Sequence, residues 1–398
     1  MTGVDLDLDL TSEEKDVRDT VHKFAAEVMR PAGEQLDALA DPADVVAPDS
    51  VLWEVFEKHR ALGLDDLGGS DLSPAQQVRM RNLIGEEMGW GDTGLSVSLG
   101  VSGFPRLVAQ MSGNPELLER FSGPDVIGCW AITEPDHGSD MVDFDHKVSA
   151  GESGRPNCIA RKDGDSFVIS GQKAAWVSNG TIANAAALFC AVDLGDGPKG
   201  SGVFAVRLDE KGVLRGKPLD KLGQRALNQG EIFFDELRVP AHSMVLGPEV
   251  YSLAADRVLC MANGGMGTSF VGLARAALEL AVDYAKERVQ GGVPIFGHQS
   301  VKARLFVMFR KVEAARALNR RVTLFNTLSP TPQIEHAIAS KVTSTNTAFE
   351  VASSALQIFG GNGLSREYPI EKLMRDARAS MIEDGCNEVL SLVGAERL

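Results

Sequence analysis

The chain has 398 residues, 44% of them hydrophobic, and a formal net charge of −15. This length favours about two or three packed units over one small core. An acidic protein is repelled by nucleic acid and by anionic membranes, so we expect neither as a partner. The five cysteines are scattered and contain no C-x-x-C pair, which argues against a disulfide framework and favours a reducing compartment. The first ten residues are acidic and lack the order of a secretion signal. These features together predict a cytoplasmic protein.

The first third of the chain has helical patterns. Thr11 and Glu14 form a capping box, and apolar residues at helical spacing follow it. Pro31 is expected at the end of this helix or just past it, because proline cannot donate a helical hydrogen bond. Further helices are expected at about 53–62 and 74–88. We predict an N-terminal helical domain over residues 1–126.

The pattern changes near Ile127, where short apolar runs broken by glycine, aspartate and proline begin. Asp163-Gly164 precedes the run at 167–169 and is typical of a hairpin turn. Runs of this kind continue to about Val245 and predict a central β domain, residues 127–245.

The last third returns to helical spacing. Apolar stripes run over 270–284 and 301–312, and another helix is expected from about Ile334, after the proline-containing break at 329–332. Long helices of this kind predict a C-terminal four-helix bundle, residues 246–398. The order α, β, α indicates an α+β fold.

Several common kinds of site have no signature here. The chain has no P-loop, no strand–G-x-G-x-x-G–helix unit near its start and no G-x-S-x-G elbow. Its seven histidines are dispersed, with no two at ligand spacing on one helix, so no metal site is expected.

Three other segments have unusual chemistry. Residues 130–140 form a polar loop after an apolar run, which can offer N–H groups and a hydroxyl to an anion or a heterocycle. Trp176 lies two residues before Ser178 and can stack on a ring, although a buried core tryptophan is the simpler reading. Residues 357–363, Q-I-F-G-G-N-G, can equally be a helix C-cap and a tight turn.

Together with four further segments in the same order, these resemble the acyl-CoA dehydrogenase family, over nearly the whole chain. The resemblance implies an FAD-dependent enzyme that desaturates the α,β bond of an acyl-CoA. The segments that carry it are A-I-T-E-P-D-H-G-S-D (131–140), K-A-A-W-V-S-N-G (173–180), K-L-G-Q-R (221–225), E-I-F-F-D-E-L-R-V-P (231–240), R-V-Q-G-G-V-P-I-F-G-H-Q (288–299), Q-I-F-G-G-N-G (357–363) and E-Y-P-I-E-K-L-M-R-D-A-R (367–378).

The resemblance assigns roles to the residues of the first two segments. Ile132 and Thr133 would lie along the isoalloxazine ring, and Ser139 near the FAD pyrophosphate or the CoA arm. Trp176 would cover the flavin, and Ser178 would bond near its hydride-accepting nitrogen.

Other residues would serve the cofactor of a second subunit. In the family pattern, Arg288 and Gln299 reach the FAD of a neighbour, while Gln357, Gly360 and Gly361 bind its adenine half. Sharing FAD in this way implies a homo-oligomer, usually a tetramer. An electron-transferring flavoprotein is the expected acceptor.

The catalytic base departs from the usual pattern. Many family members carry Y-E-G-T nine residues after the arginine of R-D-A, with the glutamate as base. Counting without gaps from Arg375 places Asp384 in this slot and Glu383 where tyrosine is usual. We therefore predict Asp384 as the base and Glu383 as the reserve candidate. The second base position known in the family falls on Ala262, which has no carboxylate. The plainer interpretation is two solvated loop acids.

Other functions of the same fold stay open at this point. They are an acyl dehydrogenase acting on a carrier-protein thioester, a flavin oxidase or monooxygenase, and an inactive binding subunit. The sequence does not predict acyl chain length or branching. Some relatives with aspartate in the base slot act on cyclic acyl-CoAs, so a ring-containing substrate is a minor expectation.

Overall fold

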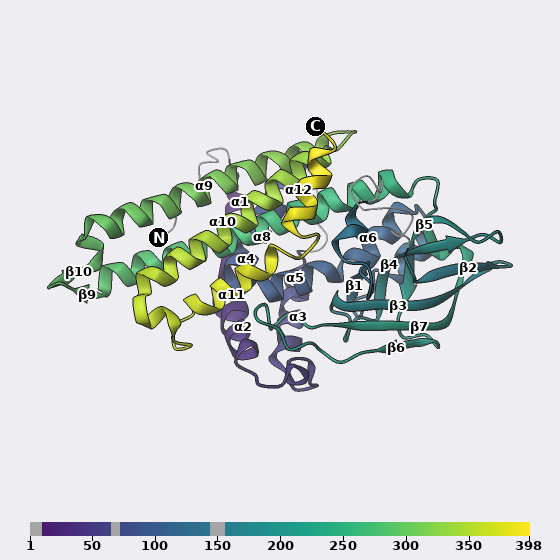
Figure 1. Cartoon of the computed structure of the whole chain (residues 1–398), viewed down its shortest axis with the longest axis horizontal. Helices are drawn as coiled ribbons and strands as arrows, with labels where there is room; N and C mark the ends of the chain where they lie inside the picture. Colours follow the sequence, from purple (N-terminus) through teal and green to yellow (C-terminus); the bar gives the residue numbers. More distant parts are fainter. Residues whose placement is uncertain (1–9, 65–71, 144–155) are drawn as a thin grey trace.

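The computed structural model describes residues 10–64, 72–143 and 156–398, and the acidic start of the chain (residues 1–9) lies outside them. Helices come first and last in the chain, with an eight-stranded sheet between them. Figure 1 shows the long C-terminal helices on one side and the sheet on the other. The α+β fold predicted from the sequence is confirmed.

The N-terminal helices pack around their own apolar core. The predicted capping box is present, with Thr11 accepting from the Glu14 N–H and Glu14 accepting from the Thr11 N–H. The helical elements before the sheet are α1 (Ser12–Phe24), η1 (Ala25–Met29), α2 (Arg30–Asp37), η2 (Pro42–Val46), α3 (Val51–Ala61), α4 (Pro74–Gly91), α5 (Thr93–Ser102), α6 (Phe104–Met111) and α7 (Pro115–Arg120).

The prediction that the first helix ends near Pro31 is wrong. A π-helical turn, η1, joins α1 to α2, and Pro31 lies in the first turn of α2. The Arg30 N–H donates to the Ala25 carbonyl, five residues back. This local change of pitch lets the helix continue past a residue that has no N–H to donate.

The sheet has the order β6-β7-β3-β2-β4-β5-β8, and β1 pairs with β4. The predicted turn at Asp163-Gly164 is confirmed, because β2 and β3 pair antiparallel on either side of it. Central strand β4 is buried on both faces, which explains its continuous apolar sequence. The strands are β1 (Gly128–Ala131), β2 (Ile159–Asp163), β3 (Ser166–Ser178), β4 (Ala185–Asp193), β5 (Pro198–Arg207), β6 (Val213–Arg215), β7 (Gln229–Pro240) and β8 (Met244–Leu246), with η4 (Ser139–Val142) after β1 and η6 (Ala241–Ser243) before β8.

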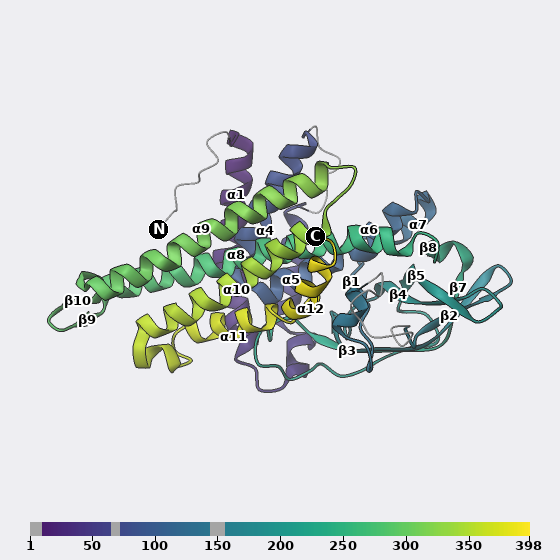
Figure 2. The ribbon, with the colours of Figure 1, turned by 45° about the horizontal axis from the view of Figure 1, so that its top comes forward.

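Helices α8, α9, α10 and α11 share one apolar core. A second core joins the start of α8 and the end of α12 to α6 and one face of the sheet, so bundle and sheet are packed directly together. Both views place the β9–β10 hairpin at the end of the bundle that points away from the sheet (Figure 2). The C-terminal elements are α8 (Tyr251–Glu287), β9 (Val289–Gln290), β10 (Val293–Pro294), η7 (Ile295–Gly297), α9 (Gln299–Leu328), α10 (Ile334–Phe359), η8 (Gly360–Leu364), α11 (Ile370–Ser380) and α12 (Asn387–Ala395).

Candidate active site

A cavity of about 410 Å³ lies where the sheet, α5, α8 and the loop between α11 and α12 meet. Its lining is mostly apolar, with a few polar groups and two adjacent carboxylates, as is usual for the binding site of an organic ligand. Seven of the residues singled out from the sequence line it: Ile132, Thr133, Ser139, Trp176, Ser178, Glu383 and Asp384.

A buried ion pair fixes the segment that follows β1. The Lys173 ammonium lies 2.6 Å from a Glu134 carboxylate oxygen and donates to the Ile132 carbonyl at 3.0 Å. The Ala174 N–H donates to the Thr133 carbonyl at 2.9 Å. Because both charges are fully buried and bonded to each other, this segment is held firmly against β3. The side chains of Ile132 and Thr133 are thereby fixed in the cavity wall.

The end of β3 presents a ring and a hydroxyl to the cavity. The Trp176 residue is 60% exposed, which leaves a large aromatic face open to a ligand. The Ser178 Oγ accepts from the Gln229 amide at 3.2 Å, so its own hydrogen remains available for donation. Nearby in the lining, the buried Trp130 Nε1 has no hydrogen-bond partner among the described residues. These features fit a planar heterocycle with polar edges, such as a flavin.

The two acids have different partners. One oxygen of Glu383 accepts from the Gln224 side-chain amide at 2.7 Å. Burial raises the pKa of Glu383 to about 7, although Lys221 and the Gln224 bond oppose the rise. Burial also raises the pKa of Asp384 to about 6, against the lowering effect of Lys341. Asp384 therefore carries a carboxylate that is charged near neutral pH and more basic than an exposed one.

Gln224 is itself fixed by a chain of buried charges. Its N–H donates to the Asp376 carboxylate at 2.5 Å, and its backbone has a positive φ of 49°. The Lys372 ammonium bridges Asp376 and Asp92 at 2.6 and 2.5 Å. Asp92 in turn accepts from the Leu95 N–H at the start of α5. Gln224, which binds Glu383, is thus connected through these buried charges to α11 and to the start of α5.

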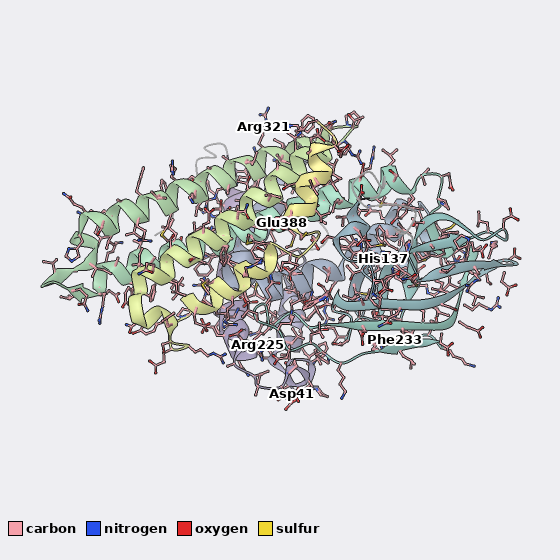
Figure 3. All side chains as sticks on the ribbon, viewed as in Figure 1. Asp41, His137, Arg225, Phe233, Arg321 and Glu388 are labelled. Atoms are coloured by element: carbon pink, nitrogen blue, oxygen red, sulfur yellow. The ribbon has the colours of Figure 1, made fainter. Side chains whose placement is uncertain are left out.

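Ser139 connects the loop after β1 to the loop that carries the acids. Its Oγ accepts from the Cys386 N–H at 2.9 Å. In Figure 3 the labelled His137 lies in the first of these loops, and the labelled Glu388 lies at the start of α12, just after the second. Of Ser139 and Cys386, which this bond joins, Ser139 lines the cavity.

Five of the predicted cofactor residues are absent from the cavity lining. Arg288 caps the end of α8, Gln299 begins α9, Gln357 is near the end of α10, and Gly360 and Gly361 begin η8. Gly360 ends α10 with a φ of 61°, a backbone conformation that favours glycine. The structure brings the other seven predicted residues together in one cavity, and these five lie outside its lining.

Sequence reasoning gave no role to three residues that shape the site, namely Lys221, Gln224 and Lys341. The first two lie in the K-L-G-Q-R segment, but their contacts with Gln229 and Glu383 depend on tertiary packing. For Lys341 a signal existed, since it is the one charged residue between His336 and Glu350, in a helix otherwise uncharged there.

Within residues 10–64, 72–143 and 156–398, no cluster of three or more histidine, cysteine, aspartate or glutamate side chains could hold a metal ion. Nor does any helix in these ranges have the length and apolar character needed to cross a membrane.

Comparisons with known proteins agree with the geometry. Residues 129–237 match the family model "Acyl-CoA dehydrogenase, middle domain", and residues 255–398 match "Acyl-CoA dehydrogenase, C-terminal domain". The chain is 33% identical to the mitochondrial short-chain specific acyl-CoA dehydrogenase of Sus scrofa, over 70% of this chain and 64% of that protein. The matched region thus spans just under two thirds of that relative's length.

For a second relative, the match covers a larger share of that protein's length. The chain is 30% identical to the cyclohex-1-ene-1-carbonyl-CoA dehydrogenase of Geobacter metallireducens, over 72% of this chain and 73% of that protein. The structure superimposes on butyryl-CoA dehydrogenase from Megasphaera elsdenii with a TM-score of 0.84 and 26% identity, over 98% of this chain and 99% of that one. The chain belongs to the acyl-CoA dehydrogenase family.

Proposed function

We propose that the protein is an FAD-dependent acyl-CoA dehydrogenase that removes an α-proton and a β-hydride from an acyl thioester. One observation carries the proposal: two adjacent carboxylates line the same cavity as the open face of Trp176 and the free hydroxyl of Ser178. A proton acceptor and a place for a flavin therefore face one cavity, as a reaction at neighbouring carbons of one substrate requires.

The chemistry requires a carboxylate that is more basic than an exposed one. The α-hydrogen of a thioester is weakly acidic, so the base must be charged and yet poorly solvated. Asp384 meets both conditions, because burial raises its pKa to about 6 and it stays charged at pH 7. Hydrogen bonds to the thioester oxygen would stabilise the enolate-like transition state. When bound, FAD would accept the hydride from the β-carbon.

We assign the base to Asp384 rather than Glu383. Glu383 already accepts a hydrogen bond from the Gln224 side-chain amide, which occupies one of its oxygens and restrains it. No described residue donates a hydrogen bond to the Asp384 carboxylate, so both its oxygens are available. Gly385 follows directly; its φ of 89° favours glycine, and a side chain there would crowd Leu390 and Val142, so the loop keeps this shape only with glycine.

The cofactor would be bound in two parts. Ile132, Thr133, Trp176 and Ser178 would hold the flavin ring in the cavity, with Ser139 near the pyrophosphate or the CoA arm. The remote group, namely Arg288, Gln299, Gln357, Gly360 and Gly361, would serve the FAD of a neighbouring subunit. This division supports a homo-oligomer, with a tetramer as the expected form. We propose an electron-transferring flavoprotein as acceptor and, since all five cysteines are free, a cytoplasmic location. The domain limits of residues 1–126, 127–245 and 246–398 are likewise proposed.

The test is a screen of acyl-CoA thioesters with a dye acceptor, using protein saturated with FAD. We expect a yellow protein with about one FAD per chain and turnover of at least one thioester in the panel. A protein that stays colourless with added FAD, or that binds FAD without turning over any acyl thioester, would contradict the proposal. Stoichiometric peroxide formation from substrate and oxygen would indicate an oxidase instead.

A ring-containing substrate is a second candidate within this function. The Asp384 side chain is one methylene shorter than glutamate, so the acyl group must lie nearer the loop or be bulkier. The similarity to the Geobacter metallireducens enzyme supports this idea. Cyclohexene-carbonyl-CoA and butyryl-CoA in the same panel would separate the two substrate classes by their kcat/KM.

A further inference from the structure

The loop that carries the two acids has an unusual backbone. It runs from Met381 to Asn387, and its ends are joined by the Asn387 N–H donating to the Met381 carbonyl at 2.9 Å. Asp384 has a φ of 51° and Gly385 a φ of 89°. Aspartate adopts such a conformation only at a cost, so the surroundings of this loop must hold it in place.

Side chains from three separate elements supply this support. The Lys341 ammonium on α10 donates to the Gly385 carbonyl at 2.8 Å and to the Asn387 side-chain oxygen at 2.9 Å. Ser139 holds the Cys386 N–H, as described above. The Asn263 amide on α8 reaches the Asp384 carbonyl at the long distance of 3.5 Å. Lys341 is the one of these three that brings a charge.

The Lys341 side chain is fully buried, and within the described part of the chain no carboxylate lies within ion-pair distance of it. A buried ammonium is costly unless an opposite charge compensates it. Burial lowers the pKa of Lys341 to about 8, and Asp384, Glu383, Cys386 and Glu388 oppose this effect, with Asp384 the strongest of the four. The negative charge that compensates this lysine is therefore that of the acids in and beside the loop. These acids lie farther from the ammonium than ion-pair distance.

The relation is reciprocal, since Lys341 is the group that opposes the effect of burial on Asp384. Without a nearby positive charge, a carboxyl in this position would be protonated at a higher pH. A protonated carboxyl cannot accept the α-proton. Lys341 thus has the position and the positive charge needed to keep the Asp384 carboxylate deprotonated.

We infer that Lys341 is a positioning residue for Asp384: it holds the loop from behind and keeps the carboxylate charged where it faces the acyl thioester. The catalytic meaning of this inference rests on the proposed function, whereas the electrostatic link between the two residues does not. Lys221, the other buried lysine near the acids, has a different place. It donates to the Leu227 carbonyl and the Gln229 side chain, and the acid that it influences is Glu383.

The test measures the titration of Asp384 directly, without a substrate. Protein labelled with ¹³C-aspartate is titrated by infrared spectroscopy, and the carboxyl band of Asp384 is identified by its loss in Asp384→Asn. In Lys341→Met we expect this band to titrate at a pH higher by about one unit or more than in the unaltered protein, because an ammonium of opposite charge has been removed. Lys221→Met is the matched control, and it should leave the pH at which Asp384 titrates unchanged.

A second variant protects the test against a failure to fold. Asn387→Asp keeps the lysine but puts a carboxylate in contact with it, which should also shift the Asp384 titration upward. If Lys341→Met folds and Asp384 titrates as before, Lys341 is only structural and the inference is overturned. If Lys341→Met does not fold and Asn387→Asp causes no shift, the inference fails as well. If the Asp384 titration shifts as expected but the protein turns over no acyl thioester, the proposed function is overturned. The electrostatic link between Lys341 and Asp384 would still stand.

Discussion

Asp384 and Glu383 are neighbours in the sequence, yet the fold gives them different surroundings. Glu383 accepts a hydrogen bond from the Gln224 side-chain amide at 2.7 Å. No described residue donates to the Asp384 carboxylate, and Lys341 binds the backbone of its loop at Gly385. We expect Asp384→Asn to retain FAD but lose kcat by about 10²–10⁴-fold, the usual contribution of a general base. Glu383→Gln, which keeps the length of the side chain and a group able to bond to Gln224, should lose far less. Stopped-flow measurement of flavin reduction would compare the two. The reverse order of effects would make Glu383 the base.

The pH dependence follows from the same assignment. The base must be deprotonated to act, and burial raises the pKa of Asp384 to about 6. The rate of flavin reduction should therefore be constant above this value and fall about tenfold per pH unit below it. A fall centred instead near pH 7, where Glu383 titrates, would point to that residue.

The sequence predicts Asp384 as the base and Glu383 as the reserve candidate, but it does not show how their surroundings differ. Counting from Arg375 places Asp384 in the base slot and Glu383 where tyrosine is usual, because spacing along one loop is a local property. The difference between them comes from Gln224, which is 159 residues before Glu383 in the chain. A contact of this kind depends on how α11 packs against the loop after β6, and a single sequence does not contain that information.

At the scale of elements, α11 positions the acid loop through one buried lysine. The Lys372 ammonium bridges Asp376 on the same helix and Asp92, which caps α5. Replacing it by methionine would leave two buried carboxylates facing each other without a cation. We expect Lys372→Met to lower the free energy of unfolding by about 3–5 kcal/mol, as measured by chemical denaturation.

The matched control is Lys58→Met, which removes a surface pair with Glu54 one helical turn away. This pair is half exposed, so its loss should cost less than about 1 kcal/mol. Equal effects of the two substitutions would mean that the Lys372 bridge contributes little to the packing of α11.

The elements themselves were predicted unevenly. Long helices such as α8 and α9 contain apolar stripes and were found. Helices α5, α6 and α7 are between six and ten residues long and follow one another closely, so no period is repeated often enough to detect them. The wrong ending at Pro31 has a different cause, since a π-helical turn leaves no clear mark in the sequence.

At the scale of the whole molecule, the predicted cofactor residues fall into two groups. Those that would hold the flavin line the cavity, while Arg288, Gln299 and Gly360 lie on the ends of bundle helices outside its lining. We propose that each group serves a different FAD molecule. This arrangement would require the chain to associate with a second copy.

Exposed aromatic side chains on α9 support the proposal that the chain associates with a second copy. Phe306 and Phe309 are 66% and 42% exposed, and their ring centroids are 6.1 Å apart. Paired aromatic side chains on a long helix are typical of a surface that another protein covers. A second copy of the chain, packed along the bundle, would bury them.

We therefore expect Phe306→Asp combined with Phe309→Asp to break the assembly, because two charges would have to be buried against apolar surface. Since a neighbour would complete each FAD site, loss of assembly should also lower the FAD content per chain. Light scattering and the flavin absorbance of the same sample measure both quantities. Leu214→Asp is the control, because Leu214 is similarly exposed, at 65%, but lies on β6 at the edge of the sheet. The control should remain oligomeric and yellow. A double variant that is monomeric and still holds one FAD per chain would show that each chain binds its cofactor alone.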